Sequence, residues 1–296
     1  MSRPECVWMK KLEFYTKISL KGFCTFKIGG KAKFLFVVHS PNQLKTAIVW
    51  CKRKNVKFKV IGLGANLLFD DLGFDGAIIV NKTNKIKVCG NYVWAFSGTT
   101  MAELIAKTKQ HNLTGFEHFA GIPSSVGGGI VNNLGAWGFN IGQNVETVKV
   151  IDVETLKTHK YNFNQCKFGY RSSVFQSKKC VVLMAKFKLK KAPITEIENN
   201  LKTALIKKST TQPIDKPSAG SVFKRTNFIP AKMIDELGLK GTTVGGAQIS
   251  TKHAGFIVNI GSATSNDVKE LIKLIENELF LHYSFTPTKE IEFVEF

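Results

Sequence analysis

The stretch GFEHFAGIPSSVGGGIVNNLGAWG, residues 115–138, decides how the rest of the chain is interpreted. It holds seven glycines, one proline and a pair of adjacent asparagines, and it has little helical or strand periodicity. So many glycines do not suit a core strand, and a simple linker would be more polar. The composition favours a backbone that wraps closely round a large ligand and donates N–H groups to it, with an irregular buried loop as the second interpretation.

A second glycine-rich segment, VIGLGANLLFDD (60–71), follows a strand-like run. Its G-x-G-x-N pattern lacks the third glycine of the dinucleotide-binding turn G-x-G-x-x-G, and no helix pattern follows it. Successive N–H groups in such a turn can bind an anion. An ordinary tight turn is equally compatible with the pattern.

Around these two blocks, strand and helix patterns alternate, which predicts an α+β fold. The expected strands cover residues 33–38, 57–64, 76–81, 92–98, 146–155, 180–190, 255–261 and 289–296. The expected helices cover residues 41–55, 101–111, 193–207, 231–238 and 266–281, with apolar stripes at i, i+3, i+4 and i+7 in the longer ones. The polar, proline-bearing stretch 207–220 indicates a domain boundary.

The bulk composition is that of an ordinary globular chain, with 296 residues, 44% hydrophobic and 22% charged. The net charge of +20 is spread along the sequence as lysines, which favours solvated faces and phosphate-bearing small molecules over nucleic acid. Six cysteines, including Cys6, form no C-x-x-C pair or Cys/His cluster, so neither a metal site nor a disulfide framework is expected. No signal peptide or membrane-length apolar run occurs, and the cytoplasm is the expected location.

A series of motifs, taken in order, carries a resemblance to a known family. They are FKIGGKAKF (26–34), IGLGANLLFDDLGFDGAII (61–79), AGIPSSVGGGIVNNLGAWG (120–138), FGYRSSVF (168–175), SAGSVFK (218–224), MIDELGLKG with VGGAQIS and HAGFIVN (233–259), and TKEIEFV (288–294). This order closely resembles the UDP-N-acetylenolpyruvoylglucosamine reductases, flavoenzymes of peptidoglycan precursor synthesis and so of cell-wall biogenesis, cell shape and cell division. The resemblance covers residues 20–295.

The resemblance implies an FAD-binding region of the vanillyl-alcohol-oxidase type, made of two subdomains, and a C-terminal α+β substrate domain. On this chain the subdomains would cover residues 1–82 and 83–208, and the substrate domain residues 209–296, whose last strand would return to the active site. The branch without an extra tyrosine-bearing loop is expected, because the stretch between FGYR and the strand at 180 is short.

The implied reaction has two stages. NADPH gives a hydride to FAD, and the hydride then passes to C3 of the enolpyruvyl group of UDP-N-acetylglucosamine enolpyruvate, which yields UDP-N-acetylmuramate. The flavin is expected to be non-covalent, because no histidine or cysteine tethering pattern occurs near residues 24–66. Apart from this substrate and NADPH, neither nucleic acid nor membrane is expected as a partner, and the chain is expected to be a monomer.

The family's catalytic residues fall on Ser221, Arg171 and Glu290. Ser221 has no nearby histidine in the sequence, and it would donate a proton to C2 after hydride addition instead of attacking a substrate. Arg171 would stabilise the substrate carboxylate or the developing enolate, the alternative being a surface ion pair. Glu290 would hold the enolate side or act as an acid, and only motif register selects it over Glu292 and Glu295.

FAD contacts are expected from the two glycine-rich segments, mainly through backbone N–H groups. The expected cofactor residues are Gly62, Leu63, Gly64, Ala65, Asn66, Leu67, Gly121, Ile122, Ser125, Val126, Gly128, Asn133 and Gly135. The expected substrate residues are Lys224, Arg225 and His253, and a structural histidine is nearly as compatible with the last position. The chain departs from the family pattern at Ser124–Ser125, at Asn132 and at Arg225–Thr226, where Asn-Pro is usual.

Two other functions stay open at this point. One is a different FAD-dependent oxidoreductase of the same superfamily, against which the C-terminal motifs speak. The other is a basic, non-catalytic nucleic-acid-binding protein, which rests on charge alone. A colourless protein that cannot bind added FAD would exclude the flavoenzyme.

Overall fold

The computed structural model describes residues 12–295, and the chain divides into two compact units. The first contains residues 34–62 and 76–206 together with the start of the described chain, and the second contains residues 16–33, 63–75 and the segment from 207 onward. Each unit is thus built from separate stretches of sequence. The domain limits expected from the sequence stay a prediction, and Cys6 lies outside the described residues.

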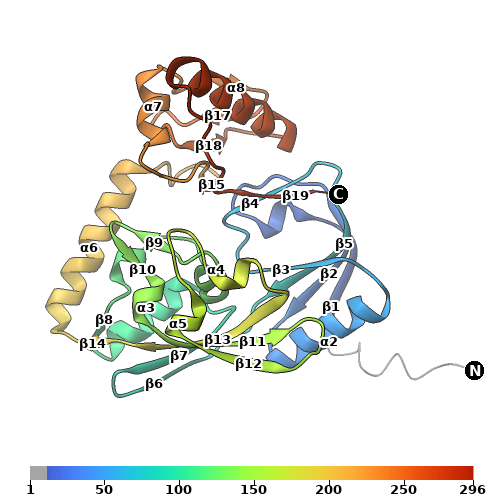
Figure 1. Ribbon diagram of the computed structural model, residues 1–296, viewed down its shortest axis with the longest axis vertical. Helices are drawn as coiled ribbons and strands as arrows, with labels where there is room; N and C mark the ends of the chain where they lie inside the picture. Colours follow the sequence, from blue (N-terminus) through green and yellow to red (C-terminus); the bar gives the residue numbers. More distant parts are fainter. Residues whose placement is uncertain (1–11, 296) are drawn as a thin grey trace, which may run out of the picture. The chain divides into compact units, whose positions relative to one another are not determined.

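One layer of the first unit is a four-stranded sheet that α2 covers (Figure 1). The sheet has the order β1 (Glu13–Ser19), β2 (Lys31–Val38), β5 (Phe74–Asn81) and β3 (Phe58–Ile61), and α2 spans Pro41–Arg53. Strands β3 and β5 are parallel. The apolar stripe expected on α2 is confirmed, because Leu44, Ala47, Ile48 and Cys51 are all buried.

The other layer is a five-stranded antiparallel sheet. Its order is β12 (Thr158–Asn162), β11 (Val145–Asp152), β13 (Cys180–Lys188), β7 (Tyr92–Phe96) and β6 (Ile86–Cys89). Helices α3 (Met101–Gln110) and α4 (Val126–Val131) contribute to the core of this layer. Thr100 and Glu103 form a capping box on α3, which fixes where that helix begins.

Short elements lie between the larger helices and strands along the chain. They are η1 (Leu20–Phe23), β8 (Leu113–Thr114), η2 (Glu117–Phe119), β9 (Gly135–Ala136), β10 (Phe139–Asn140), η3 (Ile141–Asn144), α5 (Phe163–Cys166), η4 (Val174–Gln176) and β14 (Lys190–Lys191). The long helix α6 (Ile194–Thr211) then leads the chain into the last segment. It ends four residues later than the expected 207.

The second unit contains a four-stranded antiparallel sheet and two helices (Figure 1). The sheet has the order β15 (Ser218–Ser221), β18 (Phe256–Asn259), β17 (Ala247–Ile249) and β16 (Thr243–Val244), and the helices are α7 (Pro230–Glu236) and α8 (Ser265–Tyr283). The expected stripe of α8 is confirmed by the burial of Val268, Leu271, Ile272, Ile275 and Leu279. Gly238, expected to end α7, has φ +70°, which suits glycine.

A parallel pair of short strands joins two distant parts of the sequence in this unit. Strand β4 (Leu67–Phe69) pairs with β19 (Glu292–Val294), in the register Glu292 opposite Leu67. The loop that precedes β4 is therefore held next to the end of the chain. This pairing positions one of the two glycine-rich segments.

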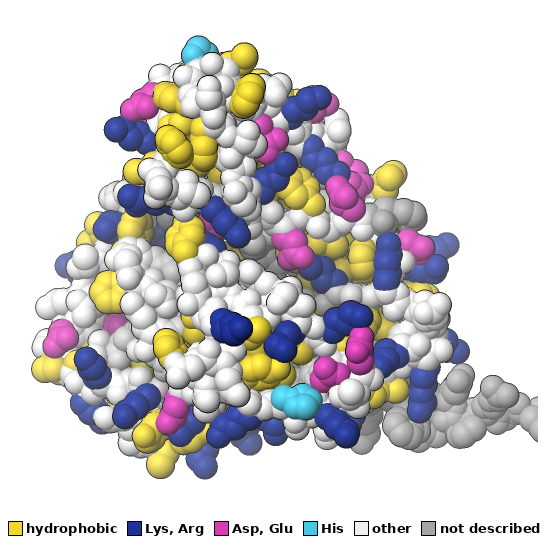
Figure 2. Space-filling model, viewed as in Figure 1, with side chains coloured by type: hydrophobic (Ala, Val, Ile, Leu, Met, Phe, Trp, Pro, Cys, Tyr) yellow, Lys and Arg dark blue, Asp and Glu magenta, His cyan; other side chains and the backbone are white. Residues whose placement is uncertain are grey.

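Charge is distributed over the surface in the same way as in the sequence. Figure 2 shows lysine and arginine side chains scattered over the visible face, with acidic and neutral side chains between them. In residues 12–295, no helix combines the length and the apolar character needed to cross a membrane. The described residues also contain no group of histidines, cysteines and carboxylates arranged to hold a metal ion.

Candidate active site

Ser221 is the last residue of β15, directly after an irregularity in that strand. Ser218 pairs with Val258 and Ser221 with Phe256, so two residues of β15 lie opposite one of β18. This is a β-bulge, a feature that re-aims side chains beside many active sites. Gly220 within it has φ +81°. The Ser221 side chain is half-buried, and it forms no hydrogen bond with any residue from 12 to 295.

Glu290 lies on the segment next to Ser221. The Glu290 N–H donates to the carbonyl oxygen of Val222 over 2.7 Å. One step further, Phe223 forms a bridge with Lys289, and the Lys224 N–H donates to the carbonyl of Thr288 over 2.8 Å. The structure therefore brings the expected proton donor and the expected glutamate onto adjacent segments of the chain.

The three C-terminal glutamates have different surroundings. Glu290 is half-buried, whereas Glu292 and Glu295 are exposed. The Glu295 carboxylate forms an ion pair with the Lys269 ammonium over 3.3 Å, and Lys269 also pairs with Asp70 over 2.7 Å. The Lys269 ammonium lowers the pKa of the Asp70 carboxyl. These differences favour Glu290, which motif register alone had selected.

The loop from Gly62 to Asn66 tests whether the chain can hold an anionic cofactor. The backbone N–H groups of Leu63, Gly64 and Ala65 donate to no group in the described part of the chain. Gly64 has φ +62°, and a Cβ there would lie 2.4 Å from the Phe23 carbonyl oxygen, so only glycine fits. Three successive free N–H groups round such a glycine make an anion-binding turn. The loop therefore fits a phosphate-bearing cofactor.

The long glycine-rich block lies in the first unit. A Cβ on Gly62 would lie 2.2 Å from Ser125 Oγ, so the two glycine-rich segments touch there. Ser125 Oγ in turn accepts the N–H of Gly128 and caps α4. A Cβ on Gly127 would lie 2.9 Å from Ser97, which brings α4 close to the end of β7. The glycines thus permit close packing of backbone at these two places.

Other expected cofactor residues serve the structure with their side chains. The Asn133 amide donates to the Gly169 carbonyl over 2.7 Å and accepts the Gly142 N–H over 3.0 Å. The Asn66 amide donates to the Glu290 carbonyl over 2.9 Å. Leu67 and Val126 are buried, Gly121 has φ +73°, and Ile122 borders the core of the five-stranded layer.

Arg171 lies in a tight turn of the first unit. Its guanidinium donates through Nη1 to the Gly135 carbonyl over 2.7 Å, and it lies 5.6 Å from the ring centre of Tyr170. Its φ of +50° is uncommon for a residue other than glycine and costs about 1–2 kcal/mol. Gln176 donates both to the Arg171 carbonyl and to Asn132 Oδ1. Asn132, where the chain departs from the family pattern, is thus linked through Gln176 to the turn that contains Arg171.

The three expected substrate residues have different environments. Lys224 is half-buried and Arg225 is exposed. His253 Nδ1 accepts the N–H of Gly255 over 3.1 Å, and its ring meets the edge of Phe256 at 4.9 Å. Burial lowers the pKa of His253, and the accepted hydrogen bond places the proton of the neutral ring on Nε2. The histidine is therefore fixed as a structural member of this loop, and its substrate role stays a prediction.

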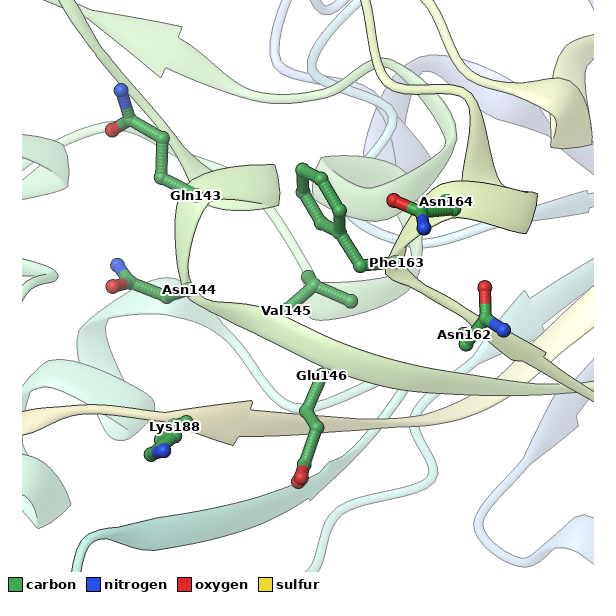
Figure 3. Close-up of a pocket in the computed structure, with 8 residues that line it drawn as sticks. All are labelled: Gln143, Asn144, Val145, Glu146, Asn162, Phe163, Asn164 and Lys188. Carbon is green, nitrogen blue, oxygen red and sulfur yellow. The ribbon is translucent and has the colours of Figure 1, made fainter.

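Three cysteines and one hollow of the structure contribute none of the expected site residues. Cys24, Cys51 and Cys166 are buried, as expected of small apolar side chains, and burial raises the pKa of Cys51 and of Cys166 to about 12. A hollow of about 480 Å³ lies beside β11 and α5 (Figure 3). No expected site residue lines it, and Gln143 and Asn162 there cap short helices.

Sequence reasoning missed two features of the site. The side chain of Asn66 was assigned no role, yet it contacts a residue 224 positions away. Gly220 was not singled out, although an isolated glycine inside a strand pattern is a signal for a bulge. Ser221 and Glu290 are brought together in the second unit, and Arg171, Asn133 and Gly135 in the first.

Comparisons with known proteins agree over most of the chain. Residues 212–294 match the family model described as the C-terminal domain of UDP-N-acetylenolpyruvoylglucosamine reductase, and residues 32–157 match that of an FAD binding domain. The reductase of Pseudothermotoga lettingae is 42% identical over 92% of this chain and 95% of its own length. That of Clostridium botulinum is 36% identical, with 93% and 90% covered.

A solved structure shares the fold. The crystal structure of UDP-N-acetylenolpyruvylglucosamine reductase from Thermus caldophilus superposes with a TM-score of 0.82 at 31% identity. The match covers 96% of this chain and 98% of that one. The expectation of an α+β fold with an FAD-binding region followed by a C-terminal domain is confirmed.

Proposed function

The chain belongs to the family of UDP-N-acetylenolpyruvoylglucosamine reductases, and from this we propose that it reduces UDP-N-acetylglucosamine enolpyruvate to UDP-N-acetylmuramate with NADPH as hydride source. It is an FAD-dependent oxidoreductase of peptidoglycan precursor synthesis. We further propose that it acts as a monomer in the cytoplasm, with these two small molecules as its partners.

The residues that would hold FAD are those of the two glycine-rich segments. The three free N–H groups of Leu63, Gly64 and Ala65 suit the pyrophosphate, and the close backbone packing at Gly62 and Ser125 suits a cofactor lying along main chain. When bound, the cofactor supplies two-electron chemistry, since it accepts a hydride from NADPH and returns it to C3 of the enolpyruvyl group. No covalent tether is proposed.

Ser221 is the proposed proton donor, and one observation carries the proposal. Its hydroxyl is half-buried, unpaired within the described residues, and presented by a bulge next to the segment that carries Glu290. Hydride addition at C3 leaves a carbanion at C2 that is far more basic than an alkoxide in a polarised site. A neutral hydroxyl can therefore give up its proton to C2 without a histidine.

The remaining proposed roles are electrostatic. The Arg171 guanidinium is a rigid fork of donors that suits a carboxylate or an enolate, and its positive φ supports a constrained functional position. Glu290 would restrain the geometry beside Ser221. Lys224 and Arg225 would take substrate phosphates, with Arg225 making contacts different from those of the usual asparagine.

An anaerobic experiment with the purified, FAD-loaded protein tests the function. NADPH should bleach the yellow flavin colour, and UDP-N-acetylglucosamine enolpyruvate should restore it without oxygen. Bleaching without recovery by this substrate, but with recovery by oxygen, would instead indicate a different oxidoreductase of the superfamily. Failure to bind FAD at all would refute both.

A further inference from the structure

Asn66 stands between the loop with free N–H groups and strand β4. Its Nδ2 donates to the Glu290 carbonyl oxygen over 2.9 Å, and its own carbonyl oxygen accepts the Glu292 N–H over 2.9 Å. One asparagine therefore holds the last strand on both sides of Ile291, which is buried. The backbone bond alone would set the strand register, so the side-chain bond adds a restraint at Glu290 itself.

The opposite edge of the same segment is tied to the Ser221 strand. The Glu290 N–H donates to the Val222 carbonyl over 2.7 Å. Peptide 289–290 carries this N–H, and peptide 290–291 carries the carbonyl that Asn66 binds. The Glu290 Cα thus lies between two anchors, one from the Ser221 segment and one from Asn66. Loss of either anchor removes a hydrogen bond from one of the two peptides that orient its side chain.

The free loop and the anchored strand differ in how they are stabilised. Leu63, Gly64 and Ala65 donate no backbone hydrogen bond within residues 12–295, and the Gly64 carbonyl accepts a long one from the Thr25 N–H over 3.4 Å, so the loop is less restrained than the anchored strand. Phosphate oxygens bound to these N–H groups would restrict the loop and the adjoining Asn66. The restriction would then pass through the amide of Asn66 to Glu290, because ordering one partner of a hydrogen bond lowers the entropy cost of forming it.

We propose that Asn66 is a positioning residue that couples occupancy of the cofactor loop to the placement of Glu290 beside Ser221. The inference rests on the proposed function for the identity of the cofactor and for the role of Glu290. The Asn66 side-chain amide would thereby affect the proton transfer to C2, in addition to any contact of its main chain with the cofactor.

The first test needs no turnover. Hydrogen exchange is measured on the apoprotein and after addition of FAD, and the readout is the backbone N–H groups of residues 289–294. In the unaltered protein FAD should slow exchange in this segment several-fold, and in Asn66→Asp this slowing should be lost. Asp keeps the size of Asn but removes the donor to the Glu290 carbonyl. Equal slowing in both proteins would overturn the coupling.

The second test separates the two half-reactions of the loaded enzyme under anaerobic conditions. In Asn66→Asp the rate of flavin reoxidation by the substrate should fall about tenfold relative to the rate of bleaching by NADPH, as expected for loss of one hydrogen bond. Asn66→Ser serves as a second variant if the aspartate prevents folding, and it should lower the same ratio.

Asn259→Asp is the matched control. Asn259 Nδ2 donates to the Phe26 carbonyl over 3.2 Å in the same unit, and its Oδ1 accepts the Gly261 and Ala263 N–H groups, which an aspartate also accepts. This variant loses the same kind of hydrogen bond, also between two distant parts of the sequence. Its ratio of reoxidation rate to bleaching rate should stay as in the unaltered protein. Equal ratios in both variants would reduce Asn66 to a structural residue. If the unaltered protein is not reoxidised by the substrate, the proposed function fails instead.

Discussion

Ser221 and His253 lie in the same small sheet region of the second unit, and their polar atoms are in opposite situations. Ser221 pairs with Phe256, three residues after His253. The histidine nitrogen Nδ1 accepts the Gly255 N–H, and burial lowers the pKa of the ring. The serine hydroxyl has no partner among the described residues. By residue type the histidine is the more obvious acid or base, yet the serine is the group left available.

Under the proposed function, this difference separates a structural side chain from a reacting one. A side chain that supports the fold has its hydrogen bonds satisfied locally, as Asn133 also does with Gly169 and Gly142. A side chain that must exchange a proton with a ligand has to keep that capacity free. Ser221 meets this condition because the bulge at Gly220 turns it out of the ordinary alternation of β15.

Replacement of Ser221 is the strongest test of the difference between Ser221 and His253. In Ser221→Ala the flavin should still be bleached by NADPH, but its reoxidation by the substrate should slow by about 10²–10⁴-fold, the usual contribution of a general acid. Stopped-flow absorbance measures both steps. Ser218→Ala, on the same strand, is the control and should retain both rates within a few-fold. An equal loss in both half-reactions of Ser221→Ala would remove the proton-donor role.

A smaller effect is expected when the direction of Ser221 is changed but its hydroxyl is kept. Gly220 has φ +81°, and a Cβ added to it would meet no atom within 4 Å, so Gly220→Ala introduces backbone strain without a clash. The strain should destabilise the protein by roughly 1 kcal/mol, measured by urea unfolding. Reoxidation by the substrate should slow by about tenfold if the strain moves the hydroxyl from its place.

Gly238→Ala provides the comparison for this variant. Gly238 has φ +70° and equally open surroundings, but it ends α7. Both variants should lose similar stability, and only Gly220→Ala should lose reoxidation rate. If the two variants behave alike in the half-reaction assay, the bulge serves the fold and not the aim of Ser221.

Much of the fold could be predicted from local patterns. The stripes of α2, α3 and α8 are buried as their spacing indicates, because a helix covered on one face must repeat its apolar residues at 3.6. Helix α4 was not predicted. It consists of Val-Gly-Gly-Gly-Ile-Val, a poor helix sequence, and it is stabilised by the Ser125 cap and by close packing of Gly127 on Ser97.

The site could be predicted only in part for a related reason. Residue types and motif order indicated Ser221, Glu290 and the glycine-rich loops. The bond from Asn66 to Glu290 depends on the parallel pairing of β4 with β19, which joins residues more than 200 positions apart. No local pattern contains that information. The occupied state of His253 Nδ1 likewise depends on the turn that brings the Gly255 N–H back to the ring.

The smallest predicted effect concerns the protonation of His253. Burial lowers its pKa, and the positive charge of Lys240 acts in the same direction, while Asp235 opposes it. The unfolded chain therefore binds a proton on this ring more readily than the folded one, so stability is complete above the unfolded pKa of about 6.5 and falls as the pH drops through the folded value. Protonation of Nδ1 would also remove the acceptor of the Gly255 N–H.

The free energy of unfolding should thus fall between pH 7.5 and 5, and His253→Gln should reduce that fall by at most about 1 kcal/mol. His118, whose pKa burial also lowers, is present in both proteins, so its contribution cancels in the difference. An unchanged pH dependence in His253→Gln would show that the folded protein does not restrain the protonation of this ring.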